Sequence, residues 1–369
     1  MTAHAILHLN SERGWRGGEA QTLFLAAGLA RRGHEVLVVA PPGSPLDQRA
    51  RAAGLPFEAL AMRGEWDLVA ARRLAALLRA RPFDRIHYHT AHAIGVGTLA
   101  SLLAGRRPAV ASRRVSFRLR GGFLGRLKYT YRVDRVIAVS EAIRRGLIAQ
   151  GLDPARVVTV HSGIDVERFA RGDRARFRAS IAGARWPPGA PVIGTAGHLA
   201  AHKGFDLFLE AAAEVARHDP RPRFVVVGTG GEDARLRTLA AALGLGDRVL
   251  FAGFRDDMPD VFAGLSVFVL ASHSGEGSPA VLKEAMAAGV PVAATSLDGV
   301  GEIIEDARHG LLTPPGDARA MARAIRTLLE DDPLRSRLVS EARRRAREFG
   351  VDRMVENTES VYASLGGVP

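Results

Sequence analysis

Short runs of β-branched and apolar residues alternate with longer amphipathic segments along this chain, and the alternation begins again halfway. The predicted strands of the first half are Ala5–Leu9, Glu35–Ala40, Arg85–His89, Pro108–Ser112, Arg135–Val139 and Val157–His161. Those of the second half are Val192–Gly197, Arg223–Gly228, Arg248–Phe251, Val267–Leu270 and Val292–Thr295. Helical patterns such as Ala20–Arg32 and Glu141–Gln150 separate the strands. This alternation predicts an α/β protein with two doubly wound parallel sheets.

The interval between the two halves, Arg171–Pro191, follows a basic helical stretch and contains Pro187, Pro188 and Gly189. Proline and glycine at this density predict a linker. The length of 369 residues is sufficient for two domains of ordinary size. We therefore expect a first domain over residues 1–170, a second over 171–350, and a C-terminal helix within 351–369.

The composition excludes some classes of protein. The chain has no cysteine, so neither a disulfide framework nor a thiolate metal site can exist. The N-terminus lacks the basic start and long apolar core of a signal peptide. The longest stretch without Asp, Glu, Lys or Arg is Ile86–Gly105, and its apolar part is too short to span a membrane. We expect a buried strand and a buried helix there, in a soluble, cytoplasmic protein.

The whole chain has a net charge of +12, and its positive charge is concentrated in one part. Between residues 101 and 150, twelve Lys or Arg residues stand against Asp134 and Glu141. We call Arg106–Arg145 the basic segment; the apolar residues interleaved in it are Phe117, Leu119, Phe123, Leu124 and Leu127. Such a segment attracts phosphorylated substrates, acidic lipids or nucleic acid, although a solvated surface is the plainer interpretation. Nucleic acid is not expected, because aromatic residues make up only 6% and no recognition module is visible. The hypothesis is peripheral attachment to the anionic inner face of the plasma membrane, or to an anionic glycolipid acceptor.

The segment Glu276–Gly289, EGSPAVLKEAMAAG, follows a predicted strand and opens a predicted helix. Glu276 and Glu284 are eight residues apart, about two helical turns, so both carboxylates can face one direction. Glu276 is expected to precede the helix near its N-terminus, where free N–H groups can also hold a phosphate. A carboxylate further along can accept hydrogen bonds from the two hydroxyls of a ribose. The alternative interpretation of the pair is simple solvation of helix charges.

This segment resembles the Glu-x7-Glu motif of the family 4 glycosyltransferases, whose GT-B fold has two Rossmann-like domains facing across a cleft. The likeness extends, in the family's order, to Gly17-Gly18-Glu19, IAVSEAIRRGL, VHSGIDVERF, GHLAAHKGFD, VLFAGF and HGLLTPPGD. It implies transfer of a sugar from a nucleotide diphosphate donor with retention of configuration and without a metal ion. It also implies that the C-terminal helix returns to the first domain.

The resemblance assigns the donor contacts residue by residue. Glu276 would contact the donor sugar and Glu284 the ribose. Backbone N–H groups of Gly277 and Ser278 would contact the diphosphate or the sugar. The pair Phe254-Arg255 lies where relatives bind the base, largely through the backbone.

Two further loops are candidate phosphate sites. Lys203 follows the first strand of the second half, where a cation would stabilise the leaving diphosphate. Relatives usually have an arginine at the position of His198, and a histidine supplies charge only when it is protonated. Gly17 and Gly18 would let the backbone approach a donor phosphate or the acceptor, unless they only form a tight turn.

The acceptor candidates follow two strands of the first half. His89 and His92 are expected to position an acceptor hydroxyl, with His92 as a catalytic residue. Arg113 and Arg114 would suit a phosphorylated or carboxylated acceptor. Asp165, in the crossover between the halves, is expected to have a structural role, as a helix cap or between domains.

The expected reaction requires no cofactor, and no Asp-x-Asp metal motif occurs near a strand end. A UDP-sugar is the expected donor ahead of a GDP-sugar, and the acceptor is a cell-envelope glycan or glycolipid such as a lipopolysaccharide core. The alternatives are a sugar-nucleotide epimerase on the same fold and a non-catalytic sugar-nucleotide-binding protein. A nicotinamide oxidoreductase is disfavoured, because LNSERGWRGGEA lacks the Gly-x-Gly-x-x-Gly pattern after the first strand.

Overall fold

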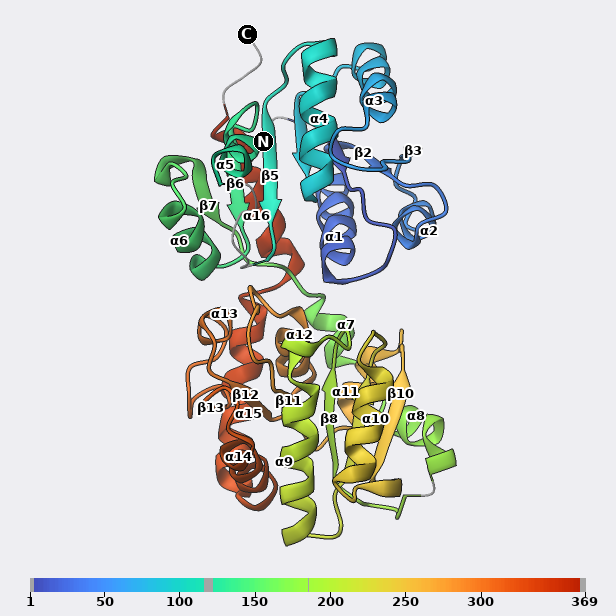
Figure 1. The fold of residues 1–369 in the computed structure, drawn as a ribbon, viewed down its shortest axis with the longest axis vertical. Coiled ribbons are helices and arrows are strands. Elements are labelled where there is room, and N and C mark those ends of the chain that lie inside the picture. The colour runs from blue at the N-terminus through green and yellow to red at the C-terminus, as the bar shows by residue number, and fades with distance from the viewer. Residues whose placement is uncertain (1–2, 116–121, 185, 366–369) are drawn as a thin grey trace. The chain divides into compact units, whose positions relative to one another are not determined.

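The computed structural model describes residues 3–115, 122–184 and 186–365. The chain divides into two compact units. Unit 1 comprises Met1–Gly163 and Val351–Pro369, and unit 2 comprises Ile164–Gly350. Each unit contains one parallel sheet with helices on both faces (Figure 1). The prediction of two doubly wound α/β sheets is therefore confirmed.

The boundary and the linker differ from the prediction. The boundary lies at Gly163 rather than at residue 170. Helix α7 (Val166–Ala170) places Phe169 against Phe262 in the core of unit 2. The predicted linker contains helix α8 (Arg174–Ser180), whose Phe177 is buried against Gly264. Phe177 thus fixes this interval to unit 2, as Phe169 fixes the helix before it, despite the prolines and glycine of the interval.

Unit 1 contains a seven-stranded parallel sheet in the order β3-β2-β1-β4-β5-β6-β7. Its strands are β1 (Ala5–Leu9), β2 (Glu35–Ala40), β3 (Phe57–Ala59), β4 (Arg85–Tyr88), β5 (Ala109–Arg113), β6 (Arg135–Ala138) and β7 (Val157–Thr159). Its helices are α1 (Gly17–Arg31), α2 (Pro45–Ala52), α3 (Leu68–Ala80), α4 (Ala91–Ala104), α5 (Gly122–Thr130), α6 (Glu141–Ala149), the 3₁₀ turn η1 (Pro154–Arg156) and α16 (Val351–Ala363).

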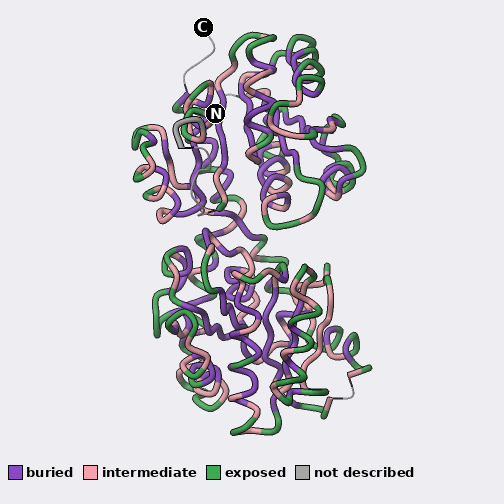
Figure 2. The backbone as a smooth tube through the Cα atoms, in the orientation of Figure 1, coloured by how far each residue is buried: buried purple, intermediate pink, exposed green. Residues whose placement is uncertain are grey.

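The two faces of this sheet pack against different helices, because successive strand residues point to opposite sides. In β1, Leu7 and Leu9 join the core under α3, α4, α5 and α6, whereas Ile6 joins the core under α1, α2 and α16. The buried strands run through the middle of the unit in Figure 2. Helix α16 completes the second face: Gly28 of α1 leaves space for Val355, since a Cβ there would lie 2.4 Å from Val355 Cγ2.

Unit 2 contains a six-stranded parallel sheet in the order β10-β9-β8-β11-β12-β13. Its strands are β8 (Val192–Ala196), β9 (Arg223–Val227), β10 (Val249–Gly253), β11 (Val267–Leu270), β12 (Val292–Thr295) and β13 (Leu311–Thr313). Besides α7 and α8, its helices are η2 (Ala182–Ala184), η3 (Ala201–Lys203), α9 (Phe205–His218), α10 (Asp233–Ala242), η4 (Gly246–Arg248), α11 (Met258–Gly264), α12 (Ala280–Ala288), α13 (Asp298–Gly301), α14 (Ala318–Glu330) and α15 (Asp332–Arg347).

The strand order shows where each sheet can bind a ligand. In a doubly wound sheet, ligands bind beyond the carboxyl ends of the strands, where the order reverses direction. This point lies between β1 and β4 in unit 1 and between β8 and β11 in unit 2. The segments that follow these four strands contain Gly17 and Gly18 at the start of α1, His89, Lys203, and Glu276.

No helix among residues 3–115, 122–184 and 186–365 is both long enough and apolar enough to cross a membrane.

Candidate active site

In unit 2 the centre of the candidate site is an ion pair between Glu276 and Lys203. Glu276 is buried, and its Oε1 accepts a hydrogen bond from Lys203 Nζ at 2.8 Å. The same oxygen accepts a hydrogen bond from the hydroxyl of Ser272, which is fully buried after β11. Two donors on one oxygen fix the direction of the carboxylate. Sequence reasoning did not identify Ser272, although it is a polar residue directly behind a buried strand.

The loop with Lys203 is held against the loop after β11. Gly204 has a φ of +65°, and a Cβ there would lie 1.9 Å from the carbonyl oxygen of Ala271. The carbonyl of His202 accepts hydrogen bonds from the backbone N–H groups of His273 and Ser274. Glycine is required here for both conformation and space. The close approach of the two loops keeps Lys203 beside Glu276.

The turn from Glu276 to Pro279 precedes helix α12, which begins at Ala280. Glu276 therefore lies before the helix, as predicted, whereas Glu284 lies within it. The turn packs tightly on α13: a Cβ on Gly299 would lie 2.2 Å from the carbonyl oxygen of Glu276 and 2.4 Å from that of Gly277.

Glu284 lies in the middle of α12 and is only partly exposed. Removal of its carboxylate from water raises the pKa to about 7, although Arg168 and Lys283 favour the charged form. Within the described residues, no side chain or backbone group forms a hydrogen bond with this carboxylate. Both of its oxygens can thus still accept hydrogen bonds, as a pair of ribose hydroxyls would require.

His198 is exposed, and its Nδ1 lies 2.8 Å from the carbonyl oxygen of Thr229. A carbonyl only accepts, so Nδ1 carries the hydrogen and donates it to Thr229. In the neutral ring Nε2 is then an acceptor, and it can donate to a phosphate only after protonation. A neutral His198 thus has no second N–H to donate to a phosphate, whereas an imidazolium has one at Nε2.

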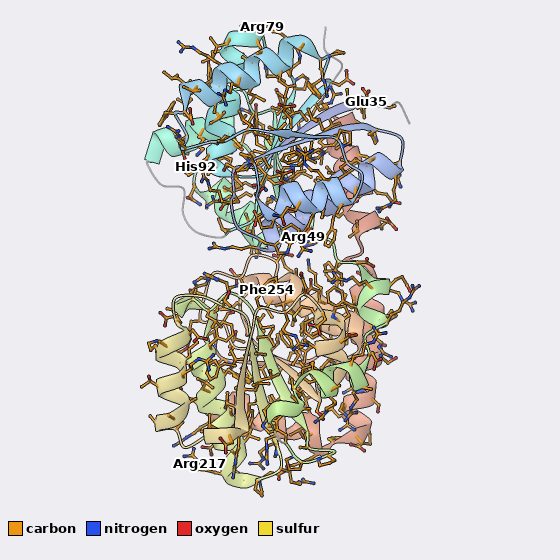
Figure 3. The ribbon with its side chains drawn as sticks, turned by 90° about the vertical axis from the view of Figure 1, so that its right-hand side faces the viewer. Glu35, Arg49, Arg79, His92, Arg217 and Phe254 are labelled. Carbon is orange, nitrogen blue, oxygen red and sulfur yellow. The ribbon has the colours of Figure 1, made fainter. Side chains whose placement is uncertain are left out.

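Phe254 and Arg255 follow strand β10. Phe254 is 57% exposed, and it lies at the opposite end of unit 2 from Arg217 (Figure 3). The guanidinium of Arg255 binds both oxygens of Asp257 and the hydroxyl of Ser180. Because Arg255 is occupied in this way, the ring of Phe254 and the backbone are the groups that remain for a base.

In unit 1, Gly17 and Gly18 are the first two residues of α1. Neither has a positive φ, so neither glycine is required by a tight turn. Among the described residues, a Cβ on Gly17 would meet no atom within 4 Å, and one on Gly18 would only touch Arg114 Cδ at 3.9 Å. The fold itself does not demand glycine here, so the space at the helix N-terminus is available to a ligand.

Beside this helix start, a buried chain of hydrogen bonds runs from Arg114 to His89 and His8. Arg114 donates to Nδ1 of His89 at 3.0 Å and to its carbonyl oxygen at 3.2 Å. His89 Nδ1 is therefore an acceptor, and Nε2 carries the hydrogen that it donates to His8 Nδ1 at 2.9 Å. Burial lowers the pKa of His8 to about 3, and burial together with His87 and Arg114 holds the pKa of His89 well below its usual value.

Both ring nitrogens of His89 are therefore engaged, one with Arg114 and the other with His8. Burial also lowers the pKa of Arg114, to about 10, so this guanidinium remains charged at neutral pH. Sequence reasoning did not identify His8, nor His87, which binds Tyr362 of α16 at 2.6 Å and Ser112 at 2.8 Å. The available signal was a histidine inside each of two apolar strands.

The structure does not bring the other two acceptor candidates to this group. Arg113 points toward α5, where it meets the hydroxyl of Tyr129 at 3.3 Å. Neighbouring strand residues face opposite sides, so Arg113 and Arg114 diverge. His92 is exposed on the first turn of α4 (Figure 3), and within the described residues it forms no hydrogen bond or ion pair. Asp165 caps α7 by accepting from the N–H of Arg168, the structural role that was predicted.

Of the described residues, His8, His87 and His89 form the one group of three potential metal ligands that lie close together. The rings are stacked, with interplanar angles of 16–28°, so their nitrogens do not point to a common centre. His89 already accepts from a guanidinium, and His87 uses both nitrogens. This arrangement fits a hydrogen-bonded network rather than a metal site.

Two family models match the chain, one in each half. The model described as "Glycosyltransferase Family 4" matches residues 15–168. The model described as "Glycosyl transferases group 1" matches residues 177–345.

The chain is similar to a D-inositol 3-phosphate glycosyltransferase of Kineococcus radiotolerans, with 32% identity over 94% of this chain and 90% of that protein. It is 30% identical to a phosphatidyl-myo-inositol mannosyltransferase of Mycolicibacterium smegmatis, over 95% and 91% of the two chains. It spans only about three fifths of some longer relatives, such as 60% of the Streptomyces bingchenggensis D-inositol 3-phosphate glycosyltransferase. Among solved structures, Anabaena HepE in complex with UDP-glucose has a TM-score of 0.88 and 25% identity, covering 98% of this chain and 100% of HepE.

Proposed function

This chain belongs to the family 4 glycosyltransferases of the GT-B fold, and we propose that it transfers a sugar from a nucleotide diphosphate donor with retention of configuration and without a metal ion. The observation that carries this proposal is the Lys203–Glu276 ion pair at the switch point of unit 2. It puts a cation and an oriented carboxylate beside one another where a nucleotide sugar would bind.

Each group has a separate task in this reaction. Lys203 neutralises the negative charge that develops on the leaving diphosphate. Glu276 accepts hydrogen bonds from hydroxyls of the donor sugar, and Glu284 accepts from the ribose. His198 supplements Lys203 only when it is protonated. The leaving diphosphate itself accepts the proton of the acceptor hydroxyl on the same face of the sugar, which gives retention.

A UDP-sugar is the proposed donor and a GDP-sugar the second choice. HepE, which shares the fold over the whole chain, is described in complex with UDP-glucose. Because Arg255 is occupied by Asp257 and Ser180, the base is read through the backbone and the ring of Phe254.

The proposed acceptor is a cell-envelope glycan or glycolipid that carries an anionic group. The support is the partly buried guanidinium of Arg114 beside the open N-terminus of α1, two features that both attract an anion. The names of the relatives, which include an inositol phosphate and a phosphatidylinositol acceptor, agree with this class.

The test is a transfer assay with a panel of labelled UDP- and GDP-sugars and acceptors of the inositol phosphate and phosphatidylinositol classes. We expect a product whose anomeric configuration, measured by NMR, equals that of the donor, at a rate that EDTA does not change. Loss of activity in EDTA with recovery in manganese would contradict the metal-independent mechanism. An epimerised nucleotide sugar without transfer would indicate the epimerase, and binding without turnover the non-catalytic protein.

We also propose that the basic segment attaches the enzyme to an anionic membrane surface. In its described part, Leu127 and Tyr131 are 39% and 46% exposed near the exposed Arg126. Some of its charge is compensated, since Arg106 pairs with Asp134 and Lys128 with Glu65. Of the interleaved apolar residues, Phe117 and Leu119 lie outside the described residues, as do the side chains of Phe123 and Leu124.

Co-sedimentation with phosphatidylglycerol and phosphatidylcholine vesicles tests this attachment. We expect pelleting with the anionic vesicles only, weakened by salt because exposed charges are screened. Arg126→Glu with Arg145→Glu should abolish pelleting, whereas Arg72→Glu with Arg73→Glu, an equal charge change on α3, should not. Equal pelleting on both vesicle types would contradict electrostatic docking.

A further inference from the structure

Helix α12 contains a fully buried lysine that the proposed reaction does not use. Lys283 has no exposed surface, and its Nζ donates a hydrogen bond to Ser278 Oγ at 2.7 Å. The ammonium also lies 4.6 Å from the ring centroid of Phe349, which follows α15. All three residues belong to unit 2, and Ser278 is in the turn expected to meet the donor.

Burial of this charge opposes folding. It lowers the pKa of Lys283 to about 7, with Glu284 and Glu302 favouring the charged form and Arg345 opposing it. The ring of Phe349 and the hydroxyl of Ser278 offset part of the lost hydration. An unbranched apolar side chain such as methionine would fit the same space without this loss, so packing alone does not call for a lysine.

The hydrogen bond to Ser278 determines how the turn is held. An ammonium group only donates, so Ser278 Oγ must be the acceptor and its side chain is fixed toward α12. On its other side the turn rests against Gly299 of α13, where no Cβ can be accommodated. The backbone of Gly277 and Ser278 is thus clamped between a side chain from α12 and the backbone of α13.

We propose that Lys283 is a positioning residue: through the Ser278 hydroxyl it fixes the Gly277–Ser278 turn so that the backbone N–H groups of this turn face the donor diphosphate. This inference rests on the proposed function, since it concerns the same donor site. Lys283 itself touches no reacting atom, and its contribution is the preorganisation of the turn.

The test is a double-mutant cycle of Lys283→Met and Ser278→Ala, with Leu282→Met as the matched control. Leu282 is fully buried on the same helix, and leucine to methionine conserves volume. Titration with UDP, and in parallel with GDP, gives the Kd, thermal melting gives the Tm, and transfer gives kcat and KM for the donor.

We expect Lys283→Met to melt no lower than Leu282→Met but to bind the nucleotide about 10- to 100-fold more weakly, the range for a hydrogen bond to a charged group. The loss should appear in KM for the donor more than in kcat. Ser278→Ala should weaken binding similarly, and the double variant should bind no worse than the weaker single variant, because the lysine acts through the serine.

Three outcomes would overturn this inference: wild-type affinity in Lys283→Met, losses that multiply in the double variant, or a lower Tm than that of Leu282→Met. A wild-type protein that binds neither nucleotide would instead refute the proposed function, and the inference with it. The two failures are therefore distinguishable from the wild-type titration alone.

Discussion

Glu284 shows how one residue can make donor binding depend on pH. Its pKa is raised to about 7, so lowering the pH through this value protonates the carboxylate that would accept from the ribose. If only the ionised form binds, the Kd for nucleotide should rise about tenfold per pH unit well below pH 7. Calorimetric titration between pH 8 and pH 5.5 measures this, with Glu284→Gln as the control. The phosphate groups of the nucleotide titrate identically in both experiments. If the Kd of Glu284→Gln depends on pH as strongly as that of the wild type, the pH dependence does not arise from Glu284.

Alanine substitutions of Glu276 and Glu284 should affect different steps, turnover in the first case and nucleotide binding in the second. Glu276→Ala removes the oriented carboxylate from the sugar site and should reduce kcat at least about 100-fold, a typical loss for a transition-state contact, with nucleotide affinity nearly unchanged. Glu284→Ala should instead weaken nucleotide binding. Steady-state kinetics with UDP titration separates the two. Equal and mild effects from both variants would mean that the site lies elsewhere.

Substitution of Gly17 tests whether glycine is required at this position by a bound ligand or by the fold. A Cβ at this position meets no described atom and the φ is not positive, so Gly17→Ala should melt at or slightly above the wild-type temperature. If a substrate oxygen approaches the start of α1, the same methyl group should lower kcat/KM by about tenfold or more. Gly14→Ala, which also meets no described atom, is the matched control. Unchanged activity in Gly17→Ala would remove this loop from the site.

Gly299 sets the distance between two elements, helix α13 and the turn before α12. A Cβ there would lie 2.2 Å from a backbone carbonyl oxygen, which cannot be relieved by a side-chain rotation. Gly299→Ala should therefore displace the turn and weaken nucleotide binding by about tenfold or more, while Gly301→Ala, with open space around it, should not. Wild-type affinity in Gly299→Ala would show that the turn does not need this contact.

At the scale of elements, the sequence predicted the strands well and the side-chain contacts poorly. Strands such as Val267–Leu270 and Val292–Thr295 agree with the prediction because a buried parallel strand is a continuous apolar run. Strands β3 and β13 were missed, because neither lies in a run of β-branched residues like the one in Val157–His161 that revealed the equally short β7. The contact of His8 with His89 depends on the pairing of β1 with β4, which no local pattern encodes.

Local sequence patterns also predicted only part of the candidate site. The motif identified Glu276, Glu284 and Lys203 because their spacing is tied to strand ends, where ligands bind. It also showed that Glu276 precedes the helix, but not that Lys203 and Ser272 donate to one oxygen of this carboxylate, because these contacts form only in the folded chain. No local pattern distinguishes Lys283 from an exposed helix lysine, and its burial beside Ser278 and Phe349 is visible only in the folded chain.

For the whole molecule, the buried histidines predict acid sensitivity of unit 1. His8, His87 and His89 are held neutral, with folded pKa values below the usual 6.5, so the unfolded chain binds more protons below pH 6.5. The free energy of unfolding should therefore fall with decreasing pH, approaching about 4 kcal/mol per pH unit for three histidines. Urea unfolding of a Trp186→Phe variant, whose remaining tryptophans Trp15 and Trp66 report unit 1, measures it.

His8→Asn is the control for this prediction. Its amide oxygen takes the place of Nδ1 as acceptor for His89, but it does not titrate. The slope should fall by about 1.4 kcal/mol per pH unit, the share of one histidine. An unchanged slope in His8→Asn would assign the acid sensitivity to other groups.

The position of α16 has a consequence for how the molecule is made. Its Val355 and Tyr362 belong to the core of unit 1, yet all of unit 2 precedes them in the chain. A nascent chain that has left the ribosome as far as Gly350 holds every residue of unit 2, whereas the sheet of unit 1 still lacks one of the three helices that cover one face. Translation therefore completes the units in the reverse of their starting order. The unit that emerges first is thus the one that stays incomplete longest during synthesis.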